Sequence, residues 1–519
     1  MLSTIDVMVV LAYAVSLFVL AQWVSREQAG HTKNARDYFL AGNSLPWWAI
    51  GASLIAANIS AEQIIGMSGS GYVIGLGIAS YEWMSAITLI LVGKYFLPIF
   101  LKHRIYTMPQ FLEQRYDHNV RMVMAFFWLG VYVFVNLTSI LWLGALAIET
   151  VAGVDLMYGL VFLGVFAIGY SLYGGLKAVA FTDIIQVVLL VLGGLLIAWI
   201  MLDKVSDGEG VIAGFKLLME KAPEKFDMIL SPDNPHYVSL PGLSVLIGGM
   251  WIMNLSYWGF NQYIIQRALA AKSTREAQKG IAFAAFLKLL MPVIVVLPGI
   301  AVFVLSPGLA KPDQAYPEAM SLLPAGILGL VFAALLAAII SSLASMINSI
   351  STIFTMDIYA SMIAREKQRN PVAVGRTVAV FSIVLAMLCA KPLLGNFDQA
   401  FQYIQEFTGF FTPGIVVIFL LGMFWKKTTA MGALAAAIGS ALLSFAFKML
   451  WPELPFIDRV GLVFLLCTAI AIAISMLQGN REQEKSIDLA DIDFTTSKGF
   501  NAAAVAVSLI LAALYATWW

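Results

Sequence analysis

The sequence predicts an all-α integral membrane protein of about 14 transmembrane helices, because its apolar residues gather in runs of about 20, the length that spans a bilayer. Of the 519 residues, 60% are hydrophobic and only 12% are charged. A chain of this length could otherwise form several soluble domains, and this composition excludes them. Two of the apolar runs are interrupted near the middle by small and polar residues, at 53–63 and 254–262.

The expected helices follow one another along the whole chain. The first apolar run has no basic flank and no small-residue cleavage site, so it is predicted to be a retained helix and not a signal peptide. The run at 322–361 is long for one span and has room for a short surface helix. In chain order, the predicted helices cover residues 5–24, 47–70, 78–101, 121–149, 157–173, 178–202, 243–266, 280–305, 322–361, 375–391, 399–425, 429–450, 458–478 and 500–519.

The two interrupted runs predict broken helices. An unwound turn at membrane depth leaves backbone groups unpaired, so it persists only where it lines a cavity or meets a ligand. Broken helices at corresponding points of two halves are typical of secondary transporters, and two repeats of five helices would be inverted relative to each other. The predicted segments are an accessory helix with a cytoplasmic loop at 1–44, the first repeat at 45–202, an extracytoplasmic loop at 203–242, the second repeat at 243–427 and the C-terminal helices at 428–519.

The distribution of basic residues predicts the orientation of the chain. If the N-terminus lies outside, most basic residues fall in inside loops, as the positive-inside rule requires. With an even number of helices, both termini then lie outside. The loop 479–499 departs from this pattern, because its acidic residues outnumber its basic ones. The basic residues assigned to inside loops are Arg26, Lys33, Arg36, Lys102, Arg104, Arg115, Arg121, Lys177, Arg267, Lys272, Arg275, Lys279, Arg365, Lys367, Arg369, Arg376, Lys426 and Lys427.

The composition also excludes several functions. No polar segment is large enough for an ATPase, a kinase or a nucleic-acid-binding domain, and no GxxxxGK[ST] phosphate-binding loop is present. An ATP-driven pump would therefore need a motor on a separate subunit. No nucleophile–base pair is evident, so an enzyme is not expected. All the histidines fall in loops, which excludes a proton relay through membrane histidines: they are His31, His103, His118 and His236.

Few ionisable residues fall inside the apolar runs, and each must face a cavity, a partner or the interface. Lys94, Asp357 and Glu406 are expected near helix ends, in structural ion pairs or reaching towards the interface. Glu82 and Lys288 lie deep in their runs and are predicted to be functional. The full set is Glu62, Glu82, Lys94, Asp183, Lys288, Asp357 and Glu406.

Polar and aromatic residues cluster in the same runs. Amides and charged groups bind several hydroxyls by fixed hydrogen bonds, and a flat aromatic ring covers an apolar ring face. This is the chemistry that a sugar requires, although aromatics in membrane helices more often serve packing. Because Glu82 balances Lys288, a neutral polyol is favoured over an acidic solute. The polar members are Gln63, Glu82, Ser85, Asn254, Lys288 and Gln405, and the aromatic ones are Tyr81, Tyr257, Trp258 and Phe401.

Two adjacent serines, Ser341 and Ser342, close the apolar stretch 333–340. A serine in a membrane helix most often bonds its own backbone. Paired hydroxyls that face an unwound helix could instead supply oxygen ligands to a hard cation. Sodium would suit a site of this kind without a carboxylate.

At these motifs the chain resembles the sodium/solute symporter family, in its sodium–glucose cotransporter branch. The resemblance extends from about residue 38 to 427 and is more specific than any single motif. It is carried by AANISAEQ at 56–63, ASYEWMS at 79–85, the GG and FTD groups within 174–183, WGFNQYIIQR at 258–267, FLK at 286–288, SSLAS at 341–345 and QAFQYIQE at 399–406.

The resemblance implies a LeuT-like core of inverted five-helix repeats and a role for each candidate residue. Gln63, Glu82, Ser85, Asn254, Lys288 and Gln405 would bind the sugar hydroxyls. Tyr257 would stack on the sugar and close the inner side, and Met67, Tyr81 and Phe401 would form the outer gate. The sodium ligands would be carbonyls of Ala56, Ile59 and Ala338 and hydroxyls of Ser341 and Ser342, with Asp183 on the exit path. Ala344 replaces a hydroxyl that relatives with a second sodium carry, which favours one sodium per sugar.

The function that the resemblance implies is symport of galactose and/or glucose with sodium, by alternating access, across a bacterial plasma (inner) membrane. The expected partners are a hexose, sodium and the lipid bilayer, without nucleic acid. The oligomeric state stays open, with a homodimer as one option. Three alternatives remain, which are a symporter of the same fold for another neutral polar solute, a solute sensor, and a sodium leak or water pathway.

Overall fold

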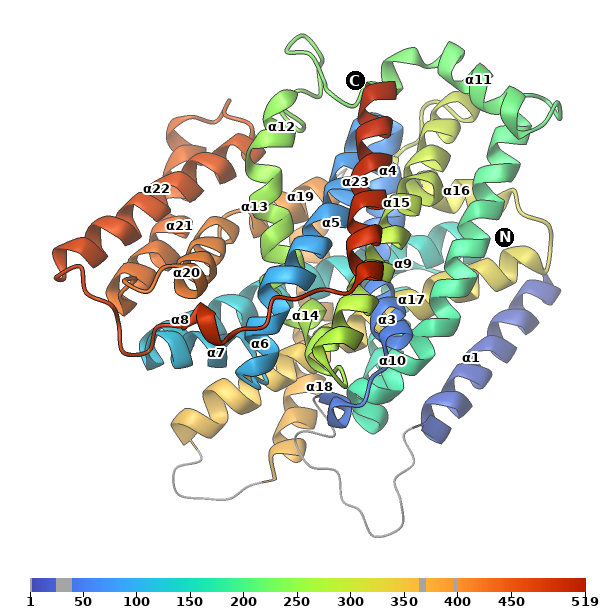
Figure 1. Ribbon diagram of the computed structural model, residues 1–519. Helices are drawn as coiled ribbons and strands as arrows, with labels where there is room; N and C mark the ends of the chain where they lie inside the picture. Colours follow the sequence, from blue (N-terminus) through green and yellow to red (C-terminus); the bar gives the residue numbers. More distant parts are fainter. Residues whose placement is uncertain (1, 25–39, 364–369, 396–399) are drawn as a thin grey trace.

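The computed structural model describes residues 2–24, 40–363, 370–395 and 400–519, and within them the regular secondary structure is helical, apart from one isolated bridge between Leu45 and Ala271. Figure 1 shows long helices packed around a central group, with α1 at one edge and the α21–α22 pair at the opposite edge. The predicted all-α membrane fold is confirmed.

Within the described residues, nine helical stretches are long and apolar enough to cross a membrane, and two pairs of bent helices raise the number to eleven. Two shorter apolar helices, Thr4–Leu20 and Leu156–Ser171, add to these. The remaining predicted span, 243–266, is built from several short helices. The helices of the first half are α1 (Thr4–Val24), α3 (Trp47–Asn58), α4 (Met67–Val73), α5 (Ser80–Leu91), α6 (Leu97–Lys102), α7 (Met108–Arg115), α8 (His118–Val131), α9 (Thr138–Ala152), α10 (Leu156–Val205) and α11 (Val211–Lys221).

The second half of the chain repeats this alternation of long and interrupted helices. Its helices are α12 (Leu243–Ile247), α13 (Gly249–Leu255), α14 (Gln262–Leu269), α15 (Thr274–Leu305), α16 (Ala315–Ser321), α17 (Ile327–Ile353), α18 (Pro371–Leu394), α19 (Ala400–Thr408), α20 (Thr412–Phe424), α21 (Ala430–Leu450), α22 (Phe456–Leu477) and α23 (Lys498–Thr517).

Both predicted breaks are present. The first lies between α3 and a π-helical turn, η2 (Glu62–Gly66), and the two arms differ in direction by 58°. The second is the π-helical turn η7 (Ser256–Phe260), after which Asn261 takes an extended conformation before α14 begins. Each break interrupts the regular helical hydrogen bonding in the middle of a buried apolar segment.

Two features of the helices differ from the sequence-based expectation. The predicted spans 157–173 and 178–202 belong to a single helical run, α10, in which the apolar part Thr182–Val205 follows the shorter one. The predicted span 399–425 is bent by 45° between α19 and α20. Pro413 explains this bend, because proline is tolerated in the first turn of a helix but cannot continue a preceding one.

The first broken helix packs against α15 at backbone distance. A Cβ atom added to Gly51 would lie 2.7 Å from the carbonyl oxygen of Gly280, and one added to Gly280 would lie 2.8 Å from that of Trp47. Small residues permit this close approach in membrane helices. This close packing holds the break that follows α3 beside α15, the helix that carries Lys288.

The two ends of the chain contact segments that were predicted at or beside the outer side. Asp6 accepts hydrogen bonds from the backbone of Gly326 and Gly329, near the start of the predicted span 322–361. At the other end, the carbonyl of Trp518 accepts from the backbone of Met228, in the loop 203–242. Both ends therefore lie on one face of the helical bundle.

The acidic loop 479–499 lies on the opposite face, against basic segments that were predicted inside. Lys102 donates to the carbonyl of Asp491, and Lys426 pairs with Asp488 at 3.4 Å. The acidic segment of this loop contacts basic residues of neighbouring segments that were predicted inside. Its excess of acidic residues is therefore compatible with the predicted orientation.

Three of the basic residues that the orientation argument counted as loop charges are in fact buried. Arg115, Arg121 and Arg267 are all under 9% exposed. Arg115 donates to the carbonyls of Gly422 and Trp425, which shows that backbone acceptors allow a guanidinium to lie inside. Outside the described residues lie Arg26, Lys33, Arg36, Arg365, Lys367, Arg369 and also Gln399 of the last motif, and the side chain of Lys177 is not described either.

Candidate substrate and sodium sites

The predicted substrate residues come together around one small buried cavity of about 50 Å³ between the two breaks. The first break contributes Gln63, and α5 contributes Glu82 and Ser85. The second half contributes the rest from α13, η7, α15 and α19. Of the predicted set, Gln63, Glu82, Ser85, Asn254, Tyr257 and Gln405 line the cavity, and Lys288 bonds to Glu82 at its wall.

Glu82 and Lys288 form a fully buried ion pair. Their side chains are 1% and 0% exposed, and the Lys288 ammonium donates to Glu82 and also to Asn58. The ammonium also lies 4.9 Å from the ring centre of Trp258. A buried charge is tolerated only when it is paired and hydrogen-bonded, and the pair leaves this part of the cavity without net charge.

Hydrogen bonds fix the neutral polar groups around the same cavity. Gln63 Nε2 donates to Glu82 Oε1 at 3.0 Å, across the first break. Ser85 Oγ lies 2.6 Å from Asn254 Oδ1, which joins α5 to α13. The lining therefore combines amide, hydroxyl and charged groups from both halves of the chain.

Of the predicted gate residues, Tyr81 and Tyr257 line the cavity. The rings of Tyr81 and Phe401 meet edge to face with their centres 5.2 Å apart, and Met67 is buried at the start of α4. Tyr257 accepts a hydrogen bond of 3.0 Å from Asn58, and its hydroxyl lies 2.6 Å from that of Tyr263.

Sequence reasoning assigned no substrate role to three residues that line this cavity, which are Asn58, Glu62 and Met253. Asn58 bonds both Lys288 and Tyr257, and Glu62 lines the cavity from the first residue of η2. Both belong to the AANISAEQ motif, so their position in the break was the available signal. The partner of Asn58 lies 230 residues away in sequence, and no local pattern predicts that contact.

The predicted sodium residues meet where α17 passes the first break. Ser342 Oγ lies 3.3 Å from the carbonyl oxygen of Ala56 and 3.2 Å from that of Ala57. Ile59 is at the C-terminal end of α3, and Ala338 precedes Ser342 by one helical turn. The assignment of Ile59 and Ala338 to the sodium site rests on these positions.

The chemistry of this region suits a hard monovalent cation. Within the described residues, no group of three His, Cys, Asp or Glu side chains could hold a metal ion. The oxygens that converge at the break are instead carbonyls and hydroxyls, which are ligands that hard cations accept.

Asp183 belongs to a separate polar network behind the serines. Its carboxylate accepts from Ser341 and, at 2.5 Å, from Ser53. Arg267 donates to Ser53 at 3.0 Å and to Ser345. A buried arginine thus joins α14 to α17 and to the first broken helix.

The remaining ionisable residues of the apolar runs have partners that explain them. Asp357 pairs with Arg121, and Glu406 pairs with Lys448 at 2.7 Å and Arg459 at 3.3 Å. The Lys94 ammonium lies 5.4 Å from the ring centre of Tyr95. These contacts agree with the structural role expected for Lys94, Asp357 and Glu406.

An all-helical membrane bundle with a break in each half, and a polar cavity between the breaks, has the architecture of a secondary transporter. Solved structures share this fold. The chain superposes with a TM-score of 0.80 on a Na⁺-coupled sialic acid symporter in its substrate-bound outward-open state, at 24% identity over 92% of this chain and 98% of that one. It also superposes with a TM-score of 0.54 on the nucleobase-cation-symport transporter Mhp1, at 14% identity over 87% and 98% of the two chains.

The sodium:solute symporter family matches residues 38–439, and the chain belongs to that family. It is similar to a sodium/glucose cotransporter of Vibrio parahaemolyticus, with 52% identity over 100% of this chain and 99% of the relative. It is also similar to sodium/myo-inositol cotransporter 2 of Mus musculus, with 33% identity over 84% of this chain and 69% of the relative. The protein is therefore a sodium/solute symporter, with sodium as its co-transported ion.

Replacing Ser342 with alanine is expected to raise the sodium concentration for half-maximal uptake by about fivefold, the effect of losing one ordinary polar contact of about 1 kcal/mol. The measurement is uptake against sodium concentration in liposomes. Ser351→Ala is a matched control on α17, because the Ser351 hydroxyl bonds Gly375 and not the break. Unchanged sodium dependence in Ser342→Ala would remove this residue from the site.

Proposed function

We propose that this symporter couples inward sodium movement to the uptake of a neutral hexose, galactose and/or glucose. The observation that carries the proposal is the Glu82–Lys288 pair at the wall of a cavity whose other polar groups are amides, hydroxyls and the carboxyl group of Glu62. Such a site offers many hydrogen-bonding groups and, among the described residues, no cation without an acidic partner, which favours a neutral polyol over an acidic solute. The relative with 52% identity, a sodium/glucose cotransporter, supports the same substrate class.

In the proposed site, the polar residues around the cavity bind the sugar hydroxyls, and Tyr257 lies against the sugar ring. Tyr81, Phe401 and Met67 close the cavity on the outer side. The oxygens of Ala56, Ile59, Ala338, Ser341 and Ser342 hold sodium, and Asp183 lies on the path by which it leaves.

The proposed coupling depends on the contact between α3 and α17. Sodium bound between Ala56 and Ser342 would hold these helices together and favour the state that accepts sugar, because a ligand shifts an equilibrium through its different affinities for the two states. Loss of sodium to the inside then releases Tyr257 and the sugar. Inward movement of one charge is favoured by about 2.3 kcal/mol for each 100 mV of membrane potential.

The arrangement in the membrane is also a proposal. We place the protein in a bacterial inner membrane with both termini outside, and we divide its core into inverted repeats at 45–202 and 243–427. The face that holds both termini also holds the loop 203–242, and the basic loops lie on the other face, which supports this orientation. Ala344 supports a stoichiometry of one sodium per sugar, since it offers no hydroxyl for a second ion.

The ring of Tyr257, and not its hydroxyl, is expected to close the inner side of the cavity. Tyr257→Ala should therefore lose sodium-driven accumulation, whereas Tyr257→Phe should keep most of it despite losing the contacts to Asn58 and Tyr263. Accumulation of labelled sugar in liposomes measures both variants. An equal loss in the two would assign the function to the hydroxyl.

The proposed function is tested by uptake of radiolabelled galactose into liposomes that contain the purified protein. An inward sodium gradient should drive accumulation, an equal potassium gradient should not, and excess glucose or galactose should compete. Sodium-driven uptake of myo-inositol without galactose uptake would keep the symporter and replace the hexose with another neutral polyol. Sodium binding without transport of any polyol would favour a sensor.

A further inference from the structure

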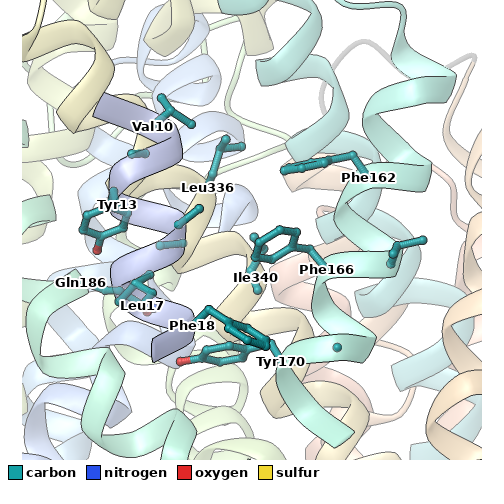
Figure 2. Close-up of a pocket in the computed structure, with 15 residues that line it drawn as sticks. Val10, Tyr13, Leu17, Phe18, Phe162, Phe166, Tyr170, Gln186, Leu336 and Ile340 are labelled. Carbon is teal, nitrogen blue, oxygen red and sulfur yellow. The ribbon is translucent and has the colours of Figure 1, made fainter. Parts of the chain in front are cut away.

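A second small cavity lies beside the substrate cavity, on the side of α8 and α19. Its volume is about 70 Å³, and Glu62, Met253, Tyr257 and Gln405 line both spaces. These four residues therefore form a common wall. The apolar crevice of about 210 Å³ between α1, α10 and α17, drawn in Figure 2, shares no described lining residue with either space and lies apart from this region.

The π-helical turn η5 (Tyr132–Leu137), between α8 and α9, lines the second cavity and contacts both breaks. Asn136 hydrogen-bonds to Glu62 in the first break, and Tyr132 hydrogen-bonds to the second. A π-helical turn inside an α-helix is frequently found at a functional site. One turn outside the two broken helices thus lies against both of them.

The hydroxyl group of Tyr132 caps the helix that follows the second break. In the described part of the chain, Asn261, the residue before α14, does not cap this helix with its own side chain. The backbone N–H of Gln262 donates instead to the Tyr132 oxygen at 2.9 Å, and the Tyr132 hydroxyl donates to the side chain of Asn261. Tyr132 and Gln262 are 1% and 0% exposed. A buried N–H group at the start of a helix needs such an acceptor, because bulk water does not reach it.

The same side chain is connected to Tyr257, which closes the inner side in the proposed function. The ring of Tyr132 meets that of Tyr263 edge to face with their centres 5.8 Å apart, and Tyr263 meets Tyr257 in the same way at 5.9 Å. Tyr257 also belongs to η7, whose last residue directly precedes Asn261. A shift at the start of α14 would therefore move Tyr257 through the backbone and through these rings.

We propose that Tyr132 is a positioning residue for the inner gate, because its hydroxyl group holds the start of α14 and thereby keeps Tyr257 at the substrate cavity. The proposal rests on the gate role of Tyr257 in the proposed function. Tyr132 and the second break belong to different helices, so opening of the inner side has to rearrange this cap. A contact that forms in only one state biases the equilibrium between states, and this one favours the closed inner gate.

The test uses one reactive cysteine in the wall of the second cavity. Cys389 and Cys467 are replaced by alanine, and Thr408→Cys supplies the thiol. Labelling by N-ethylmaleimide is measured on the purified protein in lipid nanodiscs, which requires no knowledge of the sugar. In this background Tyr257→Ala is the positive control, since it removes the gate itself and should speed labelling.

Tyr132→Phe keeps the ring and removes both hydrogen bonds, so the gate should open more often. Labelling should become about tenfold faster, as the loss of hydrogen bonds of ordinary strength would give. More sodium should then be needed to slow the labelling, because in the proposed coupling sodium favours the state that accepts sugar.

Tyr116→Phe is the matched control. The Tyr116 hydroxyl is also buried, but it donates to the carbonyl of Ile418 at 2.7 Å, between the end of α7 and α20. This variant should lower the midpoint of thermal unfolding without changing the labelling rate or its sodium dependence. The same result in Tyr132→Phe would give Tyr132 a purely structural role and overturn the proposal.

A double variant tests whether Tyr132 acts through the cap. Asn261→Ala removes the acceptor of the Tyr132 hydroxyl, so Tyr132→Phe with Asn261→Ala should label little faster than Tyr132→Phe alone. Fully additive effects would contradict the proposal. Unchanged labelling in Tyr132→Phe beside faster labelling in Tyr257→Ala would overturn it and keep the gate, whereas unchanged labelling in both would remove the gate and this inference together.

Discussion

Replacing Lys288 with alanine is expected to abolish sodium-driven sugar uptake and to destabilise the protein. The change leaves the Glu82 carboxylate, which is 1% exposed, without its opposite charge. It also removes the donor to Asn58 at the first break. Loss of one partner from a buried ion pair typically costs about 3–5 kcal/mol. Uptake in liposomes and the midpoint of thermal unfolding measure the two effects.

A double variant separates recognition from folding. Lys288→Met combined with Glu82→Gln removes both charges while keeping similar volumes, so it should recover most of the lost stability. It should not recover uptake if the charged groups bind the sugar. Normal uptake by this double variant would limit the pair to a structural role.

The pair between Lys448 and Glu406 provides a control for the loss of a lysine. Its side chains are 40% and 32% exposed, and an exposed ion pair contributes about 0–1 kcal/mol. Lys448→Ala should therefore fold and transport nearly as the parent protein does. A loss as large as that of Lys288→Ala would show that burial does not explain the effect.

The breaks could be predicted from the sequence because their signal is local. Small and polar residues within an apolar run disfavour a continuous helix wherever the run folds, and 53–63 and 254–262 both unwind. The bend before Pro413 had a local signal as well, which was overlooked because the surrounding run is strongly apolar. The continuity of α10 has no local signal in the sequence, because the residues between its two apolar parts form a helix as readily as a loop.

Long-range pairing could not be predicted in the same way. The sequence identified Glu82 and Lys288 as costly residues that need partners, but it could not show that Asn58 is the second partner of Lys288. The sequence places Arg267 among the loop charges, because it directly follows the predicted span 243–266. Its burial follows from tertiary contacts with α3 and α17, which no periodicity encodes.

Replacing Arg267 with methionine is expected to destabilise the protein by about 3–5 kcal/mol, the typical result of removing one member of a buried charged network. Arg267 is fully buried and interacts electrostatically with Asp183, which is itself 0% exposed. Without the guanidinium, Asp183 keeps the hydrogen bonds from the hydroxyls of Ser53 and Ser341 but loses the nearby positive charge. The midpoint of thermal unfolding in detergent is the direct measurement.

Two further variants separate charge from geometry. Arg267→Met with Asp183→Asn removes both charges and should regain most of the stability. Arg267→Lys keeps the charge but lacks the fork of donors that reaches both Ser53 and Ser345, so it should be only partly destabilised. If Arg267→Met is as stable as the parent protein, the guanidinium does not compensate Asp183.

The same network should also influence transport, because Arg267 joins the two broken helices through Ser53 and reaches α17, which carries the proposed sodium ligand Ser342, through Ser345. A contact that forms in only one state of a transporter biases the equilibrium between states. Arg267→Lys should therefore change the sodium concentration for half-maximal uptake even where the folded protein is retained. A purely structural arginine would lower the stability of this variant and leave its sodium dependence unchanged.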